Sequence, residues 1–458
     1  MTRRPEMMPN HAANPVPWPA LGWFAACVIL GGASNAGLLA NAALQATAIA
    51  IIAVHIGRAR SLPWFSERMP IALLVMILGG LALSLIPLPP AFWTVLPGRD
   101  EVAAGYRLLG MELPWLPISL ADDRTIRSGL ALLVPVASYL MVRNLSPRQC
   151  GQLIVLIAAS AVLSVMLGMA QLLGGPESAL RVYQITNQTV AVGLFANANH
   201  LATFLLVTIV TAFVIPISAP KLRSTKMSRG VGLRAGVPFL AIAIAVLGLV
   251  IVGSGAGLLL ALPAAVIGWL VPRNDHAANH GVVPKVTAVL ALIAIAGSVG
   301  AITTGSFADK LGTSALSRQD VSGQTLAAAR DYFPTGSGLG SFAQIYLAKS
   351  GGQGTTREWM NHAHNDLAEV LLEMGLLAGV VAGLLVLWLG RATLEIWRTR
   401  KSGEMFELGR AGVAAMWLIL IHSLVDYPLR TATIAALFGM ALALVTKARE
   451  LGARAGQE

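Results

Sequence analysis

About twelve apolar runs, each long enough to cross a bilayer as a helix of roughly 20 residues, constrain the fold of this chain more than any other feature. In lipid every backbone polar group must be satisfied inside the protein, so such a series predicts an all-α polytopic integral membrane protein. Only 12% of the residues are charged, whereas a soluble domain carries about 25%. The runs lie at approximately 18–33, 37–56, 69–88, 126–142, 150–173, 195–217, 235–253, 256–272, 284–304, 364–390, 411–427 and 430–446.

Lys and Arg residues predict the orientation of these runs. With the N-terminus in the cytoplasm, about two thirds of the 33 basic residues fall in cytoplasmic segments, as the positive-inside rule requires. Both termini are then cytoplasmic. The net charge of +11 is spread over short loops and forms no continuous basic face, so nucleic acid is not expected as a partner.

The predicted spans divide the chain into four parts. A cytoplasmic tail precedes a first helical region with an outer loop at about 89–125. A core region with a second outer loop at about 305–363 follows, and then the last helices and a tail. Their bounds are 1–17, 18–180, 181–390 and 391–458. The second loop contains a helical pattern over 319–332, followed by three glycines that predict an ordered turn, and the loop leads to the tenth run.

The stretch from Asn361 to Gly375 carries the strongest chemical signal. It brings two imidazoles, His362 and His364, to the start of the tenth run. Imidazole suits general-base catalysis near neutral pH, so we predict His364 as the catalytic base, although a lone histidine is often structural. Asn365 follows it directly, and Asn365 and His362 are predicted to contact substrate. The same helix face carries Glu369 and Glu373, and Glu373 is expected to pin helices together.

Arginines on the same outer side predict binding of a phosphate-bearing substrate, because the guanidinium fork matches phosphate oxygens. Ordinary interfacial arginines are the alternative. The candidates are Arg181, Arg318, Arg330 and Arg430. Near the sixth run, Asn197, Asn199 and His200 either cap a helix or bind sugar hydroxyls. We found no Cys/His metal spacing and no Asp-x-Asp pair at the outer face, so neither a metal nor a cofactor is expected.

Three segments and the order of the spans resemble the O-antigen ligase and polymerase family of membrane glycosyltransferases. The segments are Gly193–Ala202, Arg318 with Asp331–Phe342, and His362–Gly375, and the resemblance covers roughly 181–390. The chain departs from the family at Gly255, where relatives often place Arg after Ser, and at Ala198, where they often place Pro or Arg.

The resemblance implies metal-independent transfer of a glycan from an undecaprenyl-diphosphate carrier to an acceptor at the periplasmic face of the bacterial inner membrane. It implies His364 as base, and Arg318 and Arg181 as diphosphate ligands. The acceptor is lipid A-core or a similar lipid in a ligase and a growing glycan in a polymerase, while a protein acceptor is a third option. A polysaccharide transporter or flippase is the rival from another class. Transporters place their polar sites near the midplane and contain internal repeats, neither of which is visible in this sequence.

Overall fold

The computed structural model describes residues 15–34, 39–58, 68–215, 228–271, 320–349, 360–399 and 403–454. The regular secondary structure of the described residues is helical except for one antiparallel bridge between Leu88 and Leu116. Six of its helices are long and apolar enough to cross a membrane, and five shorter apolar helices accompany them. The protein is therefore a multi-pass, all-helical membrane protein.

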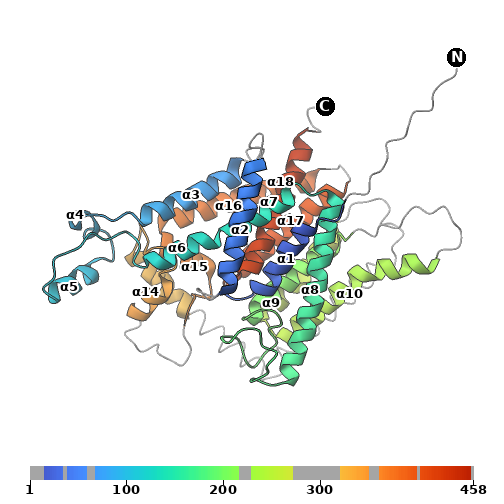
Figure 1. The fold of residues 1–458 in the computed structure, drawn as a ribbon, viewed down its shortest axis with the longest axis horizontal. Helices are drawn as coiled ribbons and strands as arrows, with labels where there is room; N and C mark the ends of the chain where they lie inside the picture. Colours follow the sequence, from blue (N-terminus) through green and yellow to red (C-terminus); the bar gives the residue numbers. More distant parts are fainter. Residues whose placement is uncertain are drawn as a thin grey trace, which may run out of the picture.

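Three buried helices form the centre of the bundle in Figure 1: α9 (Ala198–Ala212), α17 (Glu404–His422) and α18 (Ala432–Arg454). Every residue of α9 is buried. It packs against α8 (Pro147–Leu173), α10 (Ser228–Val252), α11 (Gly255–Leu270) and α17. A Cβ on Gly409 of α17 would lie 2.4 Å from Cβ of Ala448 in α18, so glycine permits the close helix approach that drives packing in lipid.

Helices from the two ends of the chain lie side by side. Thr433 at the start of α18 donates through Oγ1 to the carbonyl of Cys27 in α1 (Trp18–Leu30) at 2.8 Å. α18 also packs against α7 (Leu133–Arg143), which in turn contacts α2 (Leu39–Arg58). Few residues of α2 or of α16 (Leu376–Arg398) are buried, so these two helices present apolar surface to lipid.

Local sequence signals explain where several helices begin. Ser146 and Gln149 form a reciprocal capping box at α8. Asn197, Ser254 and Asn365 are the N-cap residues of α9, α11 and α15 (Asp366–Met374), and each accepts a backbone N–H through its side chain. Capping is thus the observed role of Asn197, one of the two alternatives that the sequence left open.

The main correction concerns the tenth predicted run, 364–390. It is two helices, α15 and α16, separated at Gly375, whose φ of +55° lies in the left-handed region. The seventh and eighth predicted runs are separate helices, α10 and α11, as expected, and Gly253 with a φ of +68° lies between them. α3 (Arg68–Ser84) and α6 (Asp122–Ala131) occupy the third and fourth runs, with α6 leading into α7. The ninth run, 284–304, lies outside the described residues.

Candidate functional site

The backbone at His364 is unusual. Its φ is +52°, the one positive φ of a non-glycine residue in the described chain, and such strain persists where the surroundings fix it. The surroundings here include Glu369, whose Oε2 accepts the backbone N–H of Ala363 at 2.8 Å. Asn365 then caps α15 by accepting the N–H of Ala368 at 3.0 Å. The turn that presents His364 is therefore held from both sides by α15.

His364 is paired with a carboxylate from a distant segment. Its Nδ1 lies 3.2 Å from Oδ1 of Asp426, which follows α17 and is buried, while the His364 side chain keeps 19% of its surface exposed. An ionised carboxylate only accepts hydrogen bonds, so Nδ1 donates and Nε2 is left as a proton acceptor. This is the tautomer that a general base needs.

His362 forms a second imidazole–carboxylate pair. Its Nδ1 lies 2.8 Å from Oε1 of Glu369, and 13% of its side chain is exposed. The same Oε1 is 3.3 Å from Nη2 of Arg430. Glu369 thus holds the two residues before His364 and is itself held by a cation.

Arg430 lies at the centre of three carboxylates on one face of α15. The contacts are 3.5 Å to Asp366, 3.3 Å to Glu369 and 3.0 Å to Glu373. Glu373 also accepts the N–H of Phe342 at 3.3 Å, so it joins α15 to α14 (Phe342–Lys349) and to the η3 turn (Pro428–Arg430). This agrees with the predicted pinning role of Glu373.

Tyr427 fills the space between the histidines. Its ring centroid lies 4.5 Å from that of His362 and 4.9 Å from those of His364 and His200. Its hydroxyl accepts a hydrogen bond from Nδ2 of Asn197 at 3.2 Å. The ring therefore joins three parts of the chain: the start of α9, the segment before α15, and the turn after α17.

The glycine loop of residues 336–340 fixes the other end of α15. The N–H groups of Ser337 and Gly338 donate to the carbonyls of Leu372 and Glu373 at 3.0 and 2.8 Å, which satisfies orphan carbonyls at the helix end. The carbonyl of Pro334 accepts the N–H of Leu376 at 2.9 Å. A Cβ at Gly375 would lie 2.1 Å from that carbonyl oxygen, so glycine is required where the chain passes the loop.

The remaining predicted residues have varied surroundings. Arg181 donates to the carbonyls of Pro176, Asn187, Gln188 and Val190, so its guanidinium braces the loop before α9. Arg330 is exposed on the helix over 320–331, and Arg318 lies outside the described residues. Asn199 and His200 are buried, so neither faces solvent where a sugar would enter.

The sequence did not single out Asp426 or Tyr427 as site residues. The sequence feature that could have identified them is the short turn Asp426-Tyr427-Pro428-Leu429-Arg430, which places a carboxylate and an arginine near the outer surface. Ser423 was also missed. Its Oγ donates to Asp366 at 2.9 Å and its carbonyl accepts the N–H of Asp366 at 2.8 Å, which ties α15 to the end of α17.

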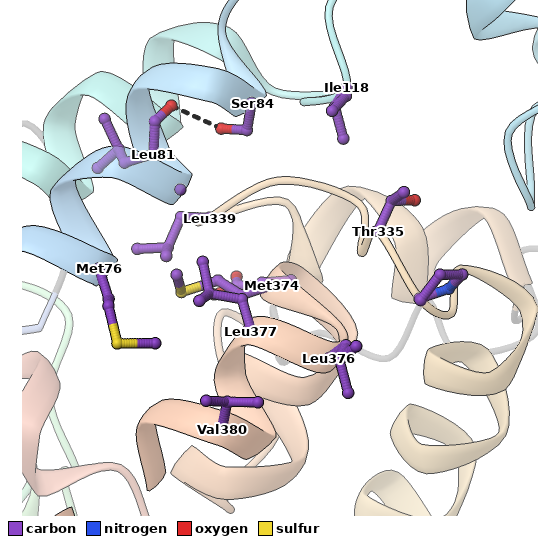
Figure 2. A pocket seen from close by; sticks show the side chains of 13 residues that line it. Met76, Leu81, Ser84, Ile118, Thr335, Leu339, Met374, Leu376, Leu377 and Val380 are labelled. Carbon is purple, nitrogen blue, oxygen red and sulfur yellow. Dashed lines mark hydrogen bonds between the residues drawn. The ribbon is translucent and has the colours of Figure 1, made fainter. Parts of the chain in front are cut away.

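An apolar pocket of about 430 Å³ lies beside the carboxylate cluster. Figure 2 shows Met76 and Leu81 of α3 facing Leu377 and Val380 of α16, with Leu339 of the glycine loop between them. Glu373, the one ionisable residue in its lining, connects the pocket with Arg430. The described residues contain no group of three or more His, Cys, Asp or Glu placed to hold a metal ion.

Comparison with known proteins gives one family match. Residues 240–383 match the family model described as O-Antigen ligase. The matched range includes His362, His364 and the whole of α15, but it ends before Asp426. A search of the curated proteins found no match.

Proposed function

We propose, from the match of residues 240–383 to the O-Antigen ligase family model, that the chain transfers a glycan from an undecaprenyl-diphosphate carrier to an acceptor hydroxyl. The observation that carries the proposal is the His364–Asp426 pair, because the histidine lies inside the family match and has a free face. The fold, with several apolar helices around a polar cluster, suits a lipid-linked substrate.

His364 acts as the general base in this proposal. Its Nε2 takes the proton of the acceptor hydroxyl while the hydroxyl oxygen attacks the anomeric carbon of the donor sugar. The bond between that carbon and the phosphate oxygen breaks, and undecaprenyl diphosphate leaves with the bonding electrons. Asp426 orients the imidazole through Nδ1 and stabilises the imidazolium that forms.

Arginine neutralises the leaving diphosphate in this proposal and supplies electrostatic stabilisation without a metal. Arg181 and Arg430 already donate to carbonyls and carboxylates, which makes Arg318 the first arginine to test. Arg318→Lys keeps the charge but loses the bidentate fork, so transfer should fall sharply. Transfer that survives both Arg318→Lys and Arg318→Ala, or that EDTA abolishes and Mg²⁺ restores, would contradict this part.

The apolar pocket between α3 and α16 is where we place the lipid chain of the donor. Its lining is apolar except for Glu373, Ser84 and Thr335, and it adjoins the cluster that holds the His362–His364 turn. The Lys and Arg distribution supports a periplasmic location for this end of the molecule, with both termini in the cytoplasm. Ligase and polymerase differ only in the acceptor, lipid A-core or a growing glycan.

The deciding experiment compares purified wild-type, His364→Asn and His55→Ala proteins in transfer of lipid-linked glycan to acceptor. Asn tolerates left-handed backbone, so His364→Asn removes the base and keeps the turn. We expect a loss of about 10²–10⁴-fold. His55 bonds the carbonyl of Ile51 in α2, away from the site, and its variant controls for loss of an imidazole.

Two results would overturn the proposal. Wild-type turnover by His364→Asn would remove His364 from the mechanism. If the wild-type protein transfers no glycan but moves lipid-linked glycan across a vesicle bilayer, it is a transporter. Equal melting temperatures of the three proteins exclude misfolding as the cause of a loss.

A further inference from the structure

The segment that joins α3 to α6, residues 85–118, projects from one end of the helical bundle (Figure 1). We call it the arm. It contains α4 (Pro90–Trp93) and α5 (Asp100–Leu108). Apart from Ile118, which lines the apolar pocket at the base of the arm, it takes no part in the catalytic or binding roles discussed above.

The arm has a defined conformation that is stabilised by internal hydrogen bonds and by a buried side chain. Leu88 and Leu116 exchange two backbone hydrogen bonds of 2.9 and 3.1 Å at its base. Trp93 is fully buried and donates through Nε1 to the carbonyl of Pro114 at 2.8 Å. The conformation of the arm, and therefore the set of side chains it exposes, is fixed by these contacts.

A second contact fixes the arm against the rest of the molecule. The guanidinium of Arg99 is buried, donates to the carbonyl of Ile118, and lies 5.9 Å from the ring centroid of Tyr332. Burial lowers the pKa of Arg99 to about 10, so it stays cationic at neutral pH. Since Tyr332 follows the helix over 320–331, the arm is held on the same side of the bundle as the glycine loop.

The exposed surface of the arm is strongly apolar. Six large apolar side chains are between 55% and 88% exposed, and they are Phe92, Val95, Leu108, Leu109, Met111 and Trp115. Water would make this exposure costly, at about 25 cal/mol per Å² of apolar surface. Exposed charge on α5 lies at both of its ends, with Asp100 and Glu101 in the first turn and Arg107 in the last, and Glu112 is exposed just beyond the helix.

This surface continues the lipid-facing surface of the bundle. α3 exposes Val75, Leu78 and Leu83, and the arm starts one residue after α3 ends. α6, which follows the arm, exposes Ile126 and Leu130. Tryptophan beside leucine and methionine, interspersed with charged side chains such as Arg107 and Glu112 that can reach the headgroups, is the composition of segments that lie in the membrane–water interface.

We propose that the arm lies in the headgroup region of the bilayer, with Leu108, Leu109, Met111 and Trp115 inserted toward the acyl chains. The partner is the lipid surface itself, and the arm is then an interfacial anchor and not a water-exposed loop. This inference does not depend on the proposed glycan transfer.

Spin labels in the full-length protein, reconstituted in lipid nanodiscs, test this directly. Cys27 and Cys150 are buried and are replaced by alanine first. Labels then go on Leu109→Cys and Trp115→Cys, with Glu101→Cys on the polar end of the same arm as the matched control. Val386→Cys, exposed on the long apolar helix α16, gives the reference for a lipid-facing site.

Collision with oxygen, which concentrates in lipid, is compared with collision with a water-soluble nickel chelate. We expect positions 109 and 115 to favour oxygen several-fold over the nickel chelate, as position 386 does, and position 101 to favour nickel. Nickel access at 109 and 115 equal to that at 101 would place the arm in water. Exclusion of both reagents at 109 and 115 would show a protein partner, such as a second copy. Either result overturns the proposal.

Discussion

His364 and Asp426 are 62 residues apart in the sequence, yet Nδ1 of the first lies 3.2 Å from Oδ1 of the second. The pair crosses from the start of α15 to the turn after α17. A buried carboxylate behind an imidazole whose opposite face is open is an arrangement that orients a base.

Asp426→Asn should keep the shape of the site but lose the fixed Nδ1–H tautomer of His364. We expect kcat for glycan transfer to fall about 10²–10⁴-fold, with little change in KM for the donor. Asp123→Asn is the matched control, because Asp123 is an exposed residue of α6 that pairs with Arg127 at 3.6 Å. A wild-type rate for Asp426→Asn would mean that the carboxylate does not orient the base.

Arg430→Ala should destabilise the protein, because it leaves Asp366, Glu369 and Glu373 without their shared cation. Removing one partner of a buried ion pair costs about 3–5 kcal/mol. Arg391→Ala removes an exposed pair with Glu395 and should cost less than about 1 kcal/mol. Thermal unfolding in detergent measures both. If Arg430→Ala melts like the wild type but loses transfer, Arg430 binds substrate, as the sequence suggested.

Gly375→Ala should damage the break between α15 and α16. The new Cβ would lie 2.1 Å from the carbonyl oxygen of Pro334, at a φ of +55°. Strain and overpacking together should cost about 2–5 kcal/mol. Gly379→Ala on α16 meets nothing closer than 3.8 Å and should leave the stability unchanged or raise it. Equal melting temperatures for the two variants would show that the glycine is not required.

The lipid pocket can be tested by filling it. Val380 lines the pocket, and Val386, on the same helix, does not, although the two side chains are 41% and 46% exposed. Val380→Trp should raise the KM for lipid-linked donor about tenfold or more, since bulky tryptophan occupies the chain's place. Val386→Trp should behave like the wild type. Equal kinetics for both variants would put the lipid chain elsewhere.

The orientation is open to cysteine labelling in a chain without Cys27 and Cys150. Gly323 and Gly57 both have open space around an added Cβ. A membrane-impermeant maleimide should label Gly323→Cys in spheroplasts with intact inner membranes, and Gly57→Cys only after permeabilisation. The reverse labelling pattern would mean that the membrane orientation is opposite to the predicted one, with the turn that carries His362 and His364 in the cytoplasm.

Sequence patterns predicted the elements that depend on local properties. Apolar runs located α2 and α8 to within a few residues, and the helical pattern over 319–332 matches the observed helix over 320–331. Asn365 was expected at a helix start, and it is the N-cap. These features depend on neighbours in the chain, which a sequence displays.

The break at Gly375 could not be predicted, because a glycine inside an apolar run is usually tolerated in a helix. Its cause is a tertiary contact with Pro334. The partnership of His364 with Asp426 also depends on how α15 packs against the end of α17. The contacts of Arg181 with four backbone carbonyls could not be predicted either, because they are set by the geometry of the loop before α9, which composition does not reveal.

Tyr427, which lies between the rings of His200, His362 and His364, also bears on the point during synthesis of the chain at which the proposed transfer activity would arise. His364, the proposed base, is synthesised first, but Asp426 and this ring follow α17, which must be inserted before they can reach it. In a nascent chain whose Asp426–Arg430 turn has not yet reached the outer side of the membrane, the imidazole of His364 therefore lacks the carboxylate that orients it. On the proposed mechanism, chains in which α17 is not yet inserted should therefore not transfer lipid-linked glycan. Ribosome-stalled chains ending before and after Asp426 would show whether the activity appears at that step.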